Sequence, residues 1–138
     1  MGTITTFVTG KQEQKKLGND YVFVSVLLDF TVKAGAAGDV VQALKIPAGA
    51  LVDEVFCVVK TAQGATCTAT VGDGDAAAGW DASVNLNAAA NTTTSALEGT
   101  DAYAVGKYYA SADTIDLVLG HTTDAAKIYV AARYAMIG

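Results

Sequence analysis

The sequence has few of the residues on which catalytic and cofactor sites usually depend. It contains one histidine, two cysteines, one proline and one tryptophan in 138 residues, and only 8% of its residues are aromatic. His121 lies in the predicted turn "GHTTD" and is the single possible base for a Ser/His or Cys/His pair. Asp53 and Glu54 are neighbours on a predicted strand, so we expect them on opposite faces rather than converging on a substrate. Phosphate-binding glycine patterns are absent. We predict no catalytic residues and no cofactor.

Cysteine and long apolar runs are also scarce. Cys57 and Cys67 are ten positions apart without a CxxC pair, a spacing that does not indicate a zinc site. We expect two reduced, buried thiols, with a disulfide across a hairpin as the alternative. The longest apolar run, Tyr21–Leu28, is shorter than the roughly 20 residues of a membrane-spanning helix. Residues 11–20 are polar where a secretory signal would be apolar. We therefore expect a protein made in a cytoplasm, with no membrane partner.

Positive charge is scarce after residue 20. Residues 1–20 carry three lysines and two acidic residues, a net charge of +1, whereas the remaining chain carries six basic and twelve acidic residues, a net charge of −6. A body this acidic repels nucleic-acid phosphates, so we expect no nucleic-acid partner. The mean hydropathy is nevertheless +0.32. Alanine and valine supply much of the apolar content, which favours a thin core and further burial through self-association.

What the sequence does contain is the alternation of apolar and polar residues typical of β-strands. Every even position from Val22 to Val32 is apolar, and Ile115, Leu117 and Leu119 alternate with the outward-facing Thr114 and Asp116. Alternation and short apolar runs between turn residues predict strands at 22–32, 40–46, 51–60, 66–71, 84–86, 113–119 and 127–137.

Turn spacing then predicts the fold class. The runs at 51–60 and 66–71 are separated by the turn "TAQGA", which favours a hairpin. About eight strands with turns every 8–12 residues predict an all-β protein, an antiparallel β-sandwich of jelly-roll-like form. We assign residues 21–138 to this sandwich domain.

The first long strand is apolar on both faces at its beginning. Tyr21, Phe23 and Leu27 occupy odd positions that would face solvent in an ordinary sandwich. We therefore expect these three residues to be covered by a partner and treat them as interface candidates.

Residues 1–20 differ in character from the rest of the chain. The stretch "KQEQKKLGND" has no pattern of a buried strand. One interpretation is a flexible tail, and the other is an extended N-terminal arm that orders against a partner. Phe7 and Val8 would give such an arm apolar residues to dock, so we include them among the interface candidates.

The stretch "VGDGDAAAGWD" (Val71–Asp81) concentrates acidic residues. An EF-hand loop starting at Asp73 would need glycine and glutamate where the sequence has Ala78 and Val84. A nonstandard calcium site that uses Asp73, Asp75 and Asp81 remains an alternative.

A turn is the simpler explanation of the same stretch. We expect glycines with positive φ and aspartate side chains, Asp73 and Asp75, that accept backbone hydrogen bonds. Trp80 would anchor the loop to the sheet through its large apolar area.

Exposed aromatic residues raise a second possible function. Trp80, Tyr103, Tyr108 and Tyr109 could form a platform for a sugar ring. In the alternative interpretation, one of the adjacent tyrosines faces the core and the other caps the rim.

Four stretches in residues 46–138 form a recognisable pattern: "IPAGALVDEVFCVV", "TVGDGDAAAGWDA", "YYASADTIDLVLG" and the closing "AKIYVAARYAMIG". In these stretches the chain resembles small virion proteins of tailed bacteriophages. The resemblance implies a jelly-roll virion component of the head-decoration (cement) type, often a trimer on the capsid. The expected function is to stabilise the head by bridging subunits of the major capsid protein, which with further copies of the chain itself would be its partners. The expected location is the capsid surface, after synthesis in the bacterial host cytoplasm. A receptor- or glycan-binding module of a tail or fibre is the alternative.

Overall fold

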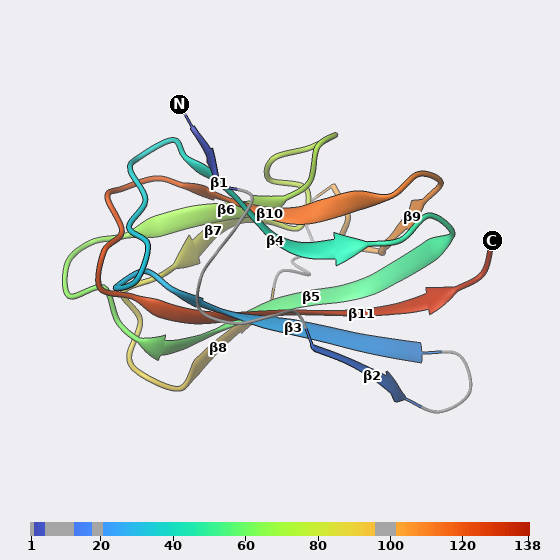
Figure 1. The fold of residues 1–138 in the computed structure, drawn as a ribbon, viewed down its shortest axis with the longest axis horizontal. Helices are drawn as coiled ribbons and strands as arrows, with labels where there is room; N and C mark the ends of the chain where they lie inside the picture. Colours follow the sequence, from blue (N-terminus) through green and yellow to red (C-terminus); the bar gives the residue numbers. More distant parts are fainter. Residues whose placement is uncertain (1, 5–12, 18–20, 96–101) are drawn as a thin grey trace.

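The computed structural model describes residues 2–4, 13–17, 21–95 and 102–138 (Figure 1). These residues form strands and connecting turns, and none of them forms a helix long and apolar enough to span a membrane. The strands are β1 (Thr3–Ile4), β2 (Glu13–Leu17), β3 (Tyr21–Asp29), β4 (Val40–Ile46), β5 (Ala50–Thr61), β6 (Thr68–Gly72), β7 (Asp81–Asn85), β8 (Thr92–Ser95), β9 (Lys107–Tyr109), β10 (Asp113–Leu119) and β11 (Lys127–Met136).

Two sheets pack face to face as a β-sandwich, which confirms the predicted fold class. The first sheet has the order β1-β4-β10-β6-β7, and the second has the order β2-β3-β11-β5-β8, with β9 also paired to β5. Figure 1 shows the first sheet above the second. All pairs are antiparallel except β1 with β4. The sandwich therefore has the mainly antiparallel, jelly-roll-like form that the strand spacing predicts.

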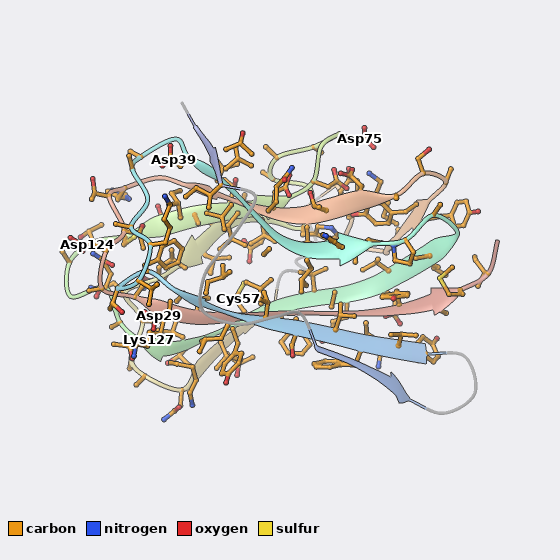
Figure 2. The ribbon with its side chains drawn as sticks, in the orientation of Figure 1. Asp29, Asp39, Cys57, Asp75, Asp124 and Lys127 are labelled. Atoms are coloured by element: carbon orange, nitrogen blue, oxygen red, sulfur yellow. The ribbon has the colours of Figure 1, made fainter. Side chains whose placement is uncertain are left out.

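The core lies between the two sheets and follows the predicted alternation. On β3, Val24, Val26 and Leu28 are buried, and on β10 the buried residues include Ile115 and Leu117. The predicted inward residues of β5 and β11 are buried as well: Val55, Cys57, Val59, Ile128, Val130, Ala132 and Tyr134. Figure 2 shows Cys57 between the sheets. Cys57 and Cys67 are both buried and free, as expected, and burial with the charge of Asp81 raises the pKa of Cys57 to about 12.

Three expectations about individual strands are wrong. β5 and β6 are not a hairpin, because β5 belongs to the second sheet and β6 to the first, and the connecting turn crosses between the layers. The long strand ends at Asp29, so Val32 is exposed rather than inward. At the end of the chain, Met136 is also exposed. Local alternation predicts which residues are apolar on one face but not which strand lies alongside.

The first twenty residues contribute a strand to each sheet. β1 pairs with β4, and the polar β2 pairs with β3 through five consecutive residues. A strand at the edge of a sheet needs no apolar face, which explains why its sequence gave no strand signal. Phe7 and Val8 lie outside the described residues, and the division into an arm and a domain stays a prediction.

Candidate functional site

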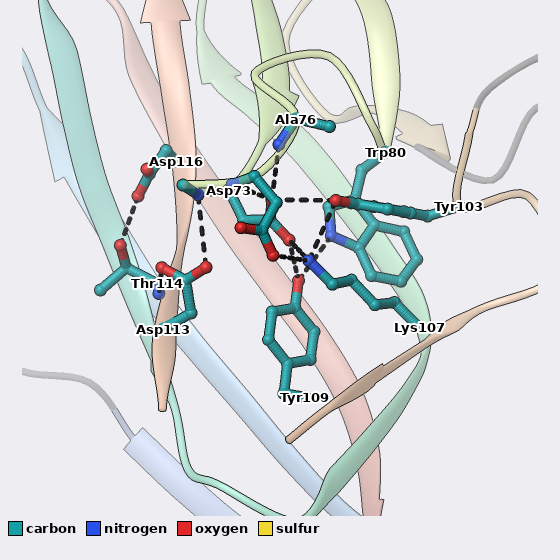
Figure 3. A network of polar contacts seen from close by, with 11 residues as sticks. Asp73, Ala76, Trp80, Tyr103, Lys107, Tyr109, Asp113, Thr114 and Asp116 are labelled. Atoms are coloured by element: carbon teal, nitrogen blue, oxygen red, sulfur yellow. Dashed lines mark hydrogen bonds and ion pairs between the residues drawn. The ribbon is translucent and has the colours of Figure 1, made fainter. Parts of the chain in front are cut away.

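Asp73 is the centre of a buried polar network at the end of β6 (Figure 3). Its side chain is completely buried. One carboxylate oxygen accepts hydrogen bonds from the backbone N–H groups of Asp75 and Ala76, at 2.9 and 3.0 Å, and from the Tyr103 hydroxyl at 3.0 Å. The other oxygen accepts from the Lys107 ammonium and the Tyr109 hydroxyl, each at 2.7 Å. These five donors satisfy a charge that would otherwise be costly to bury.

Lys107 connects this carboxylate to the opposite sheet. Asp73 follows β6 of the first sheet, whereas Lys107 begins β9, which pairs with β5 of the second sheet. The ammonium also contacts Asp75 at 2.8 Å and donates to the Tyr103 hydroxyl at 3.0 Å. Only 16% of the Lys107 side chain is exposed. The ion pair therefore crosslinks the two layers of the sandwich without a covalent bond.

Aromatic rings enclose the ion pair. The Lys107 Nζ lies 4.6 Å from the ring centroids of both Tyr103 and Tyr109. Trp80 is fully buried, packs edge-on against Tyr103 with centroids 5.2 Å apart, and donates its indole N–H to the Tyr109 hydroxyl at 3.2 Å. The two tyrosine rings therefore hold the ammonium in a favourable cation–π position.

The network shifts the pKa values of its members. Burial alone would raise the pKa of Asp73, but the hydrogen bonds from Lys107, Tyr109 and the backbone outweigh it and lower the pKa. Burial would lower the pKa of Lys107, but its bonds to Asp73, Asp75 and Tyr103 raise it. Burial and the neighbouring Asp73 raise the pKa of Tyr109. At neutral pH the site therefore holds a charged carboxylate–ammonium pair beside two neutral tyrosines.

Two glycines allow the surrounding loop to close. A Cβ on Gly72 would collide with the backbone of Ala76 and Ala77, and a Cβ on Gly79 would collide with the Tyr103 ring. The expected positive φ in this loop is wrong, because the described glycines with positive φ are Gly38, Gly49, Gly64 and Gly106. The expectation that Asp73 accepts backbone hydrogen bonds is confirmed.

The acidic residues of the loop group differently from the proposed calcium site. The carboxylates that come within 4.8 Å of one another are those of Asp73, Asp75 and Asp113. Asp81 is not in this group; it is buried and accepts a hydrogen bond from the Ser83 N–H at 2.9 Å. The Lys107 ammonium lies within 2.8 Å of two members of the group. A side-chain cation thus already supplies the positive charge here.

Asp116 is a buried carboxyl that the alternation assigned to solvent. Its exposed fraction is 6%, and its Oδ1 accepts a hydrogen bond from the Thr114 hydroxyl at 2.6 Å. Burial raises its pKa to about 6, opposed by that hydrogen bond and assisted by the charges of Asp113 and Asp73. The loop after β6 lies beside the start of β10, where the Gly74 N–H donates to Asp113 at 3.3 Å.

The aromatic residues do not form the sugar platform considered from the sequence. Trp80 and Tyr109 are buried, and Tyr103 donates to Asp73 and packs against Trp80. Of these four aromatic residues, Tyr108 alone is substantially exposed, at 46%. The other interpretation of the tyrosine pair is confirmed, because Tyr109 faces inward and Tyr108 outward. His121 is exposed, and its Nδ1 accepts a hydrogen bond from the Thr68 N–H at 3.3 Å.

The interface candidates Tyr21, Phe23 and Leu27 share the outer face of the second sheet. The register places Leu27 opposite Tyr129, and Phe23 opposite Arg133. Phe56 lies on the same face, with its ring centroid 5.9 Å from that of Phe23. We call this surface the outer sheet face; its members are Tyr21, Phe23, Ser25, Leu27, Glu54, Phe56, Val58, Tyr129, Ala131 and Arg133.

Asp53 and Glu54 do not point to opposite faces as expected. The register of β5 against β11 shifts at this point, so that Arg133 contacts both carboxylates, Asp53 at 2.9 Å and Glu54 at 3.7 Å. The bulge adds a residue, which breaks the strict alternation of an ideal strand.

Comparison with known proteins identifies the fold but no family. No protein-family model matches the sequence, and no curated protein matches it significantly. A chain in the acidic stable capsid structure of Helicobacter pylori bacteriophage KHP30 is similar, with a TM-score of 0.65 and 14% identity over 91% of this chain and 95% of that one. A chain of the Ralstonia phage GP4 capsid is similar with a TM-score of 0.58 and 17% identity, over 100% of this chain and 97% of that one. A chain of the cyanophage Pam1 capsid asymmetric unit is similar with a TM-score of 0.57 and 14% identity, over 96% of this chain and 97% of that one. Each likeness extends over at least nine tenths of both chains.

Proposed function

We propose that this protein is a structural component of a bacteriophage virion, and specifically a decoration protein that stabilises the head. The observation that carries the proposal is the fold shared with chains from three phage capsids. Because each alignment covers at least nine tenths of both chains, the shared unit is a whole chain of the same size rather than a common module inside larger proteins. The sequence motifs that resemble small virion proteins support the same function.

The site geometry supports a mechanical role. The Asp73–Lys107 pair, its aromatic enclosure and the hydrogen bonds around it fasten one sheet to the other. A sandwich whose layers are fastened internally transmits a load without sliding. The enclosed charges are satisfied by one another, so they hold the layers together rather than act on a substrate.

We propose that the protein binds the major capsid protein as a homo-oligomer on the outer surface of the head and bridges neighbouring subunits. A contact that buries about 1,500 Å² would suffice for stable attachment, although area alone does not set affinity. Decoration of a shell that already exists distinguishes this role from that of a shell-forming subunit.

The test is deletion of the gene in the phage that encodes this chain. Virions should contain the protein by mass spectrometry, and the deletion should leave complete heads that release DNA at a lower temperature. Absence of the protein from purified virions would refute a virion function. A deletion that prevents shell assembly would refute decoration and assign a shell subunit. Antibody labelling of tails instead of heads would favour the tail or fibre alternative, which the burial of Trp80 and Tyr109 does not support as a glycan platform.

A further inference from the structure

Asp116 is a buried carboxyl that receives much less hydrogen bonding than Asp73. Asp73 accepts five hydrogen bonds, one of them from the Lys107 ammonium. Among the described residues, the Thr114 hydroxyl is the one donor to the Asp116 side chain, at 2.6 Å, although only 6% of Asp116 is exposed (Figure 3). Burying an ionised carboxylate with so few donors is unfavourable. The structure therefore favours the protonated, neutral form of Asp116.

The 73–79 loop lies next to Asp116. In the register of β10 with β6, Asp116 is directly opposite Gly72. Residues in such a pair share one face of the sheet, with about 5 Å between them. On this face the loop closes over Gly72, where a Cβ would collide with the backbone of Ala76 and Ala77. The loop backbone therefore stands beside the Asp116 side chain and limits its contact with water.

Exposed hydrogen bonds hold the middle of this loop to the first sheet. The Thr70 hydroxyl of β6 donates to the Ala77 carbonyl at 2.9 Å. The Gly74 N–H donates to the Asp113 carboxylate of β10 at 3.3 Å. Segments with solvent-exposed hydrogen bonds open locally at a lower free energy than the core. The loop can therefore lift from β10 while the two sheets stay packed.

Two aspartate charges add to the effect of burial on Asp116. Asp113 lies three positions earlier on β10, and Asp73 directly follows Gly72. The pKa of Asp116 is raised to about 6, first by burial and then by the charges of Asp113 and Asp73, against an opposing side-chain hydrogen bond. Ionisation of Asp116 thus adds a further negative charge to a region that already carries two.

The lysines near this region lie on β4 and β9. β4 places the neutral Gln42 opposite Asp116, and Lys45 lies opposite Thr114. Lys107 of β9 is already held by two carboxylates of the loop, at 2.7 and 2.8 Å. The charges that shift the pKa of Asp116 are accordingly those of the aspartates.

From these observations we infer that protonation of Asp116 controls closure of the 73–79 loop. The neutral carboxyl allows the loop to lie against β10, whereas the ionised carboxylate favours a lifted loop that admits water. The closed form has its full advantage below about pH 4, where an unburied aspartate is also protonated, and loses it as the pH rises through about 6. The equilibrium constant for opening should consequently increase about tenfold between pH 5 and pH 7.5.

The loop borders a hollow of about 500 Å³ at the β9 end of the sandwich. Its lining includes Gly74 and Asp75 of the loop, and Ser111 and Asp113 beyond β9. Lifting of the loop changes the shape of this hollow, and with it the surface that this end presents to a partner. The closure is a property of the isolated chain, so the inference stands or falls independently of the proposed virion function.

Hydrogen exchange of the Tyr103 amide, followed by NMR on the full chain, measures the opening. This N–H donates to the Gly79 carbonyl at 2.8 Å, so it exchanges when the end of the loop moves away. Each rate is divided by the intrinsic exchange rate at the same pH. The Gly35 amide, which donates to the Thr123 carbonyl beyond the other end of β10, is the internal reference. We expect opening at Tyr103 to increase about tenfold from pH 5 to pH 7.5, and opening at Gly35 to stay constant.

Three variants assign the pH dependence to a residue. Asp116→Asn should abolish it, because asparagine stays neutral at every pH. His121→Asn is the matched control and should retain it, since histidine also titrates near pH 6 and His121 lies in the turn after β10. Asp113→Asn removes a charge that raises the pKa of Asp116, so the change with pH should become smaller.

The inference would be overturned by opening at Tyr103 that is the same at pH 5 and pH 7.5. It would equally be overturned if the change persists in Asp116→Asn or disappears in His121→Asn. Circular dichroism establishes that each variant is folded. If Asp116→Asn does not fold, Asp113→Asn decides, and an undiminished change in that variant contradicts the inference.

Discussion

The Asp73–Lys107 ion pair makes a sharp prediction about stability. The substitution Lys107→Met removes the ammonium but keeps a flexible side chain of similar length. Asp73 would then remain as a carboxylate with a completely buried side chain, held by tyrosine hydroxyls and backbone N–H groups alone. Breaking a buried pair by removing one partner costs about 3–5 kcal/mol. Because Lys107 is 16% exposed, we expect the lower end, about 3 kcal/mol.

Chemical denaturation at pH 7 measures this loss, and in thermal unfolding it corresponds to a decrease in Tm of about 10 °C for a domain of this size. Lys60→Met is the matched control. Lys60 donates to Asn91 at 2.7 Å on the surface. An exposed contact of this kind contributes at most about 1 kcal/mol. Equal losses for Lys107→Met and Lys60→Met would refute the conclusion that the network holds the sheets together.

The pH dependence supplies an independent check of the same reasoning. The pKa of Asp73 is lowered in the folded protein. Its ionised form therefore stabilises the fold above the unfolded pKa of about 3.9, and this contribution disappears as the pH falls through the lower folded pKa. Burial raises the pKa of Asp73, and the hydrogen bond from Lys107 is the main interaction that lowers it. Lys107→Met removes this hydrogen bond, so the pKa of Asp73 should rise. The difference in the free energy of unfolding between the unmodified protein and Lys107→Met should consequently be largest at pH 7 and shrink toward pH 4. A difference that is constant over this range would show that the loss is due to packing instead of charge.

Three further predictions follow from single residues. The pKa of Asp116 is raised to about 6, above its unfolded value, so ionisation of Asp116 destabilises the fold increasingly from about pH 4 to pH 6 and fully above pH 6. In urea titrations at pH 7, Asp116→Asn should raise the free energy of unfolding by about 1–2 kcal/mol. A variant whose stability depends on pH as in the unmodified protein would contradict this. Gly79→Ala should cost about 1–3 kcal/mol because its Cβ meets the Tyr103 ring, whereas Gly74→Ala, whose Cβ would lie 3.3 Å from an Asp113 oxygen, should cost less in the same denaturation assay. Cys57 and Cys67 should react with a thiol reagent only after denaturant is added, because both are buried; two fast-reacting thiols in the native protein would contradict the described packing.

Sequence alternation predicted the layers better than it predicted their connections. The inward residues of β3, β5 and β10 were identified because a residue's face depends only on its own strand. The pairing of β5 was missed because a short turn can either reverse a strand within a sheet or carry it across to the other sheet. The polar β2 was missed because an edge strand does not need an apolar face.

The candidate site was predicted only in part. The turn at Asp73 could be recognised from the side-chain hydrogen bonds that aspartate makes after a strand, and these are present. Its partners, Tyr103, Lys107 and Tyr109, are at least 30 positions away, in a segment without a clear strand pattern. A lysine four residues after one tyrosine and two before another is a weak signal, and only the fold brings the three to the carboxylate.

The Asp73–Lys107 network and the outer sheet face are both related to the limited apolar area that is buried between the two sheets. Nearly half of the core residues are valine or alanine, which offer limited apolar area, and the layers gain further cohesion from an enclosed ion pair and aromatic rings at one end. The apolar residues that would otherwise enlarge the core, Phe23, Phe56 and Leu27, are instead placed on the opposite side of the second sheet. An isolated domain gains little from that placement, because those side chains stay partly hydrated. The arrangement becomes favourable once another surface covers them, and for that reason we expect the assembled protein to be more stable than the monomer.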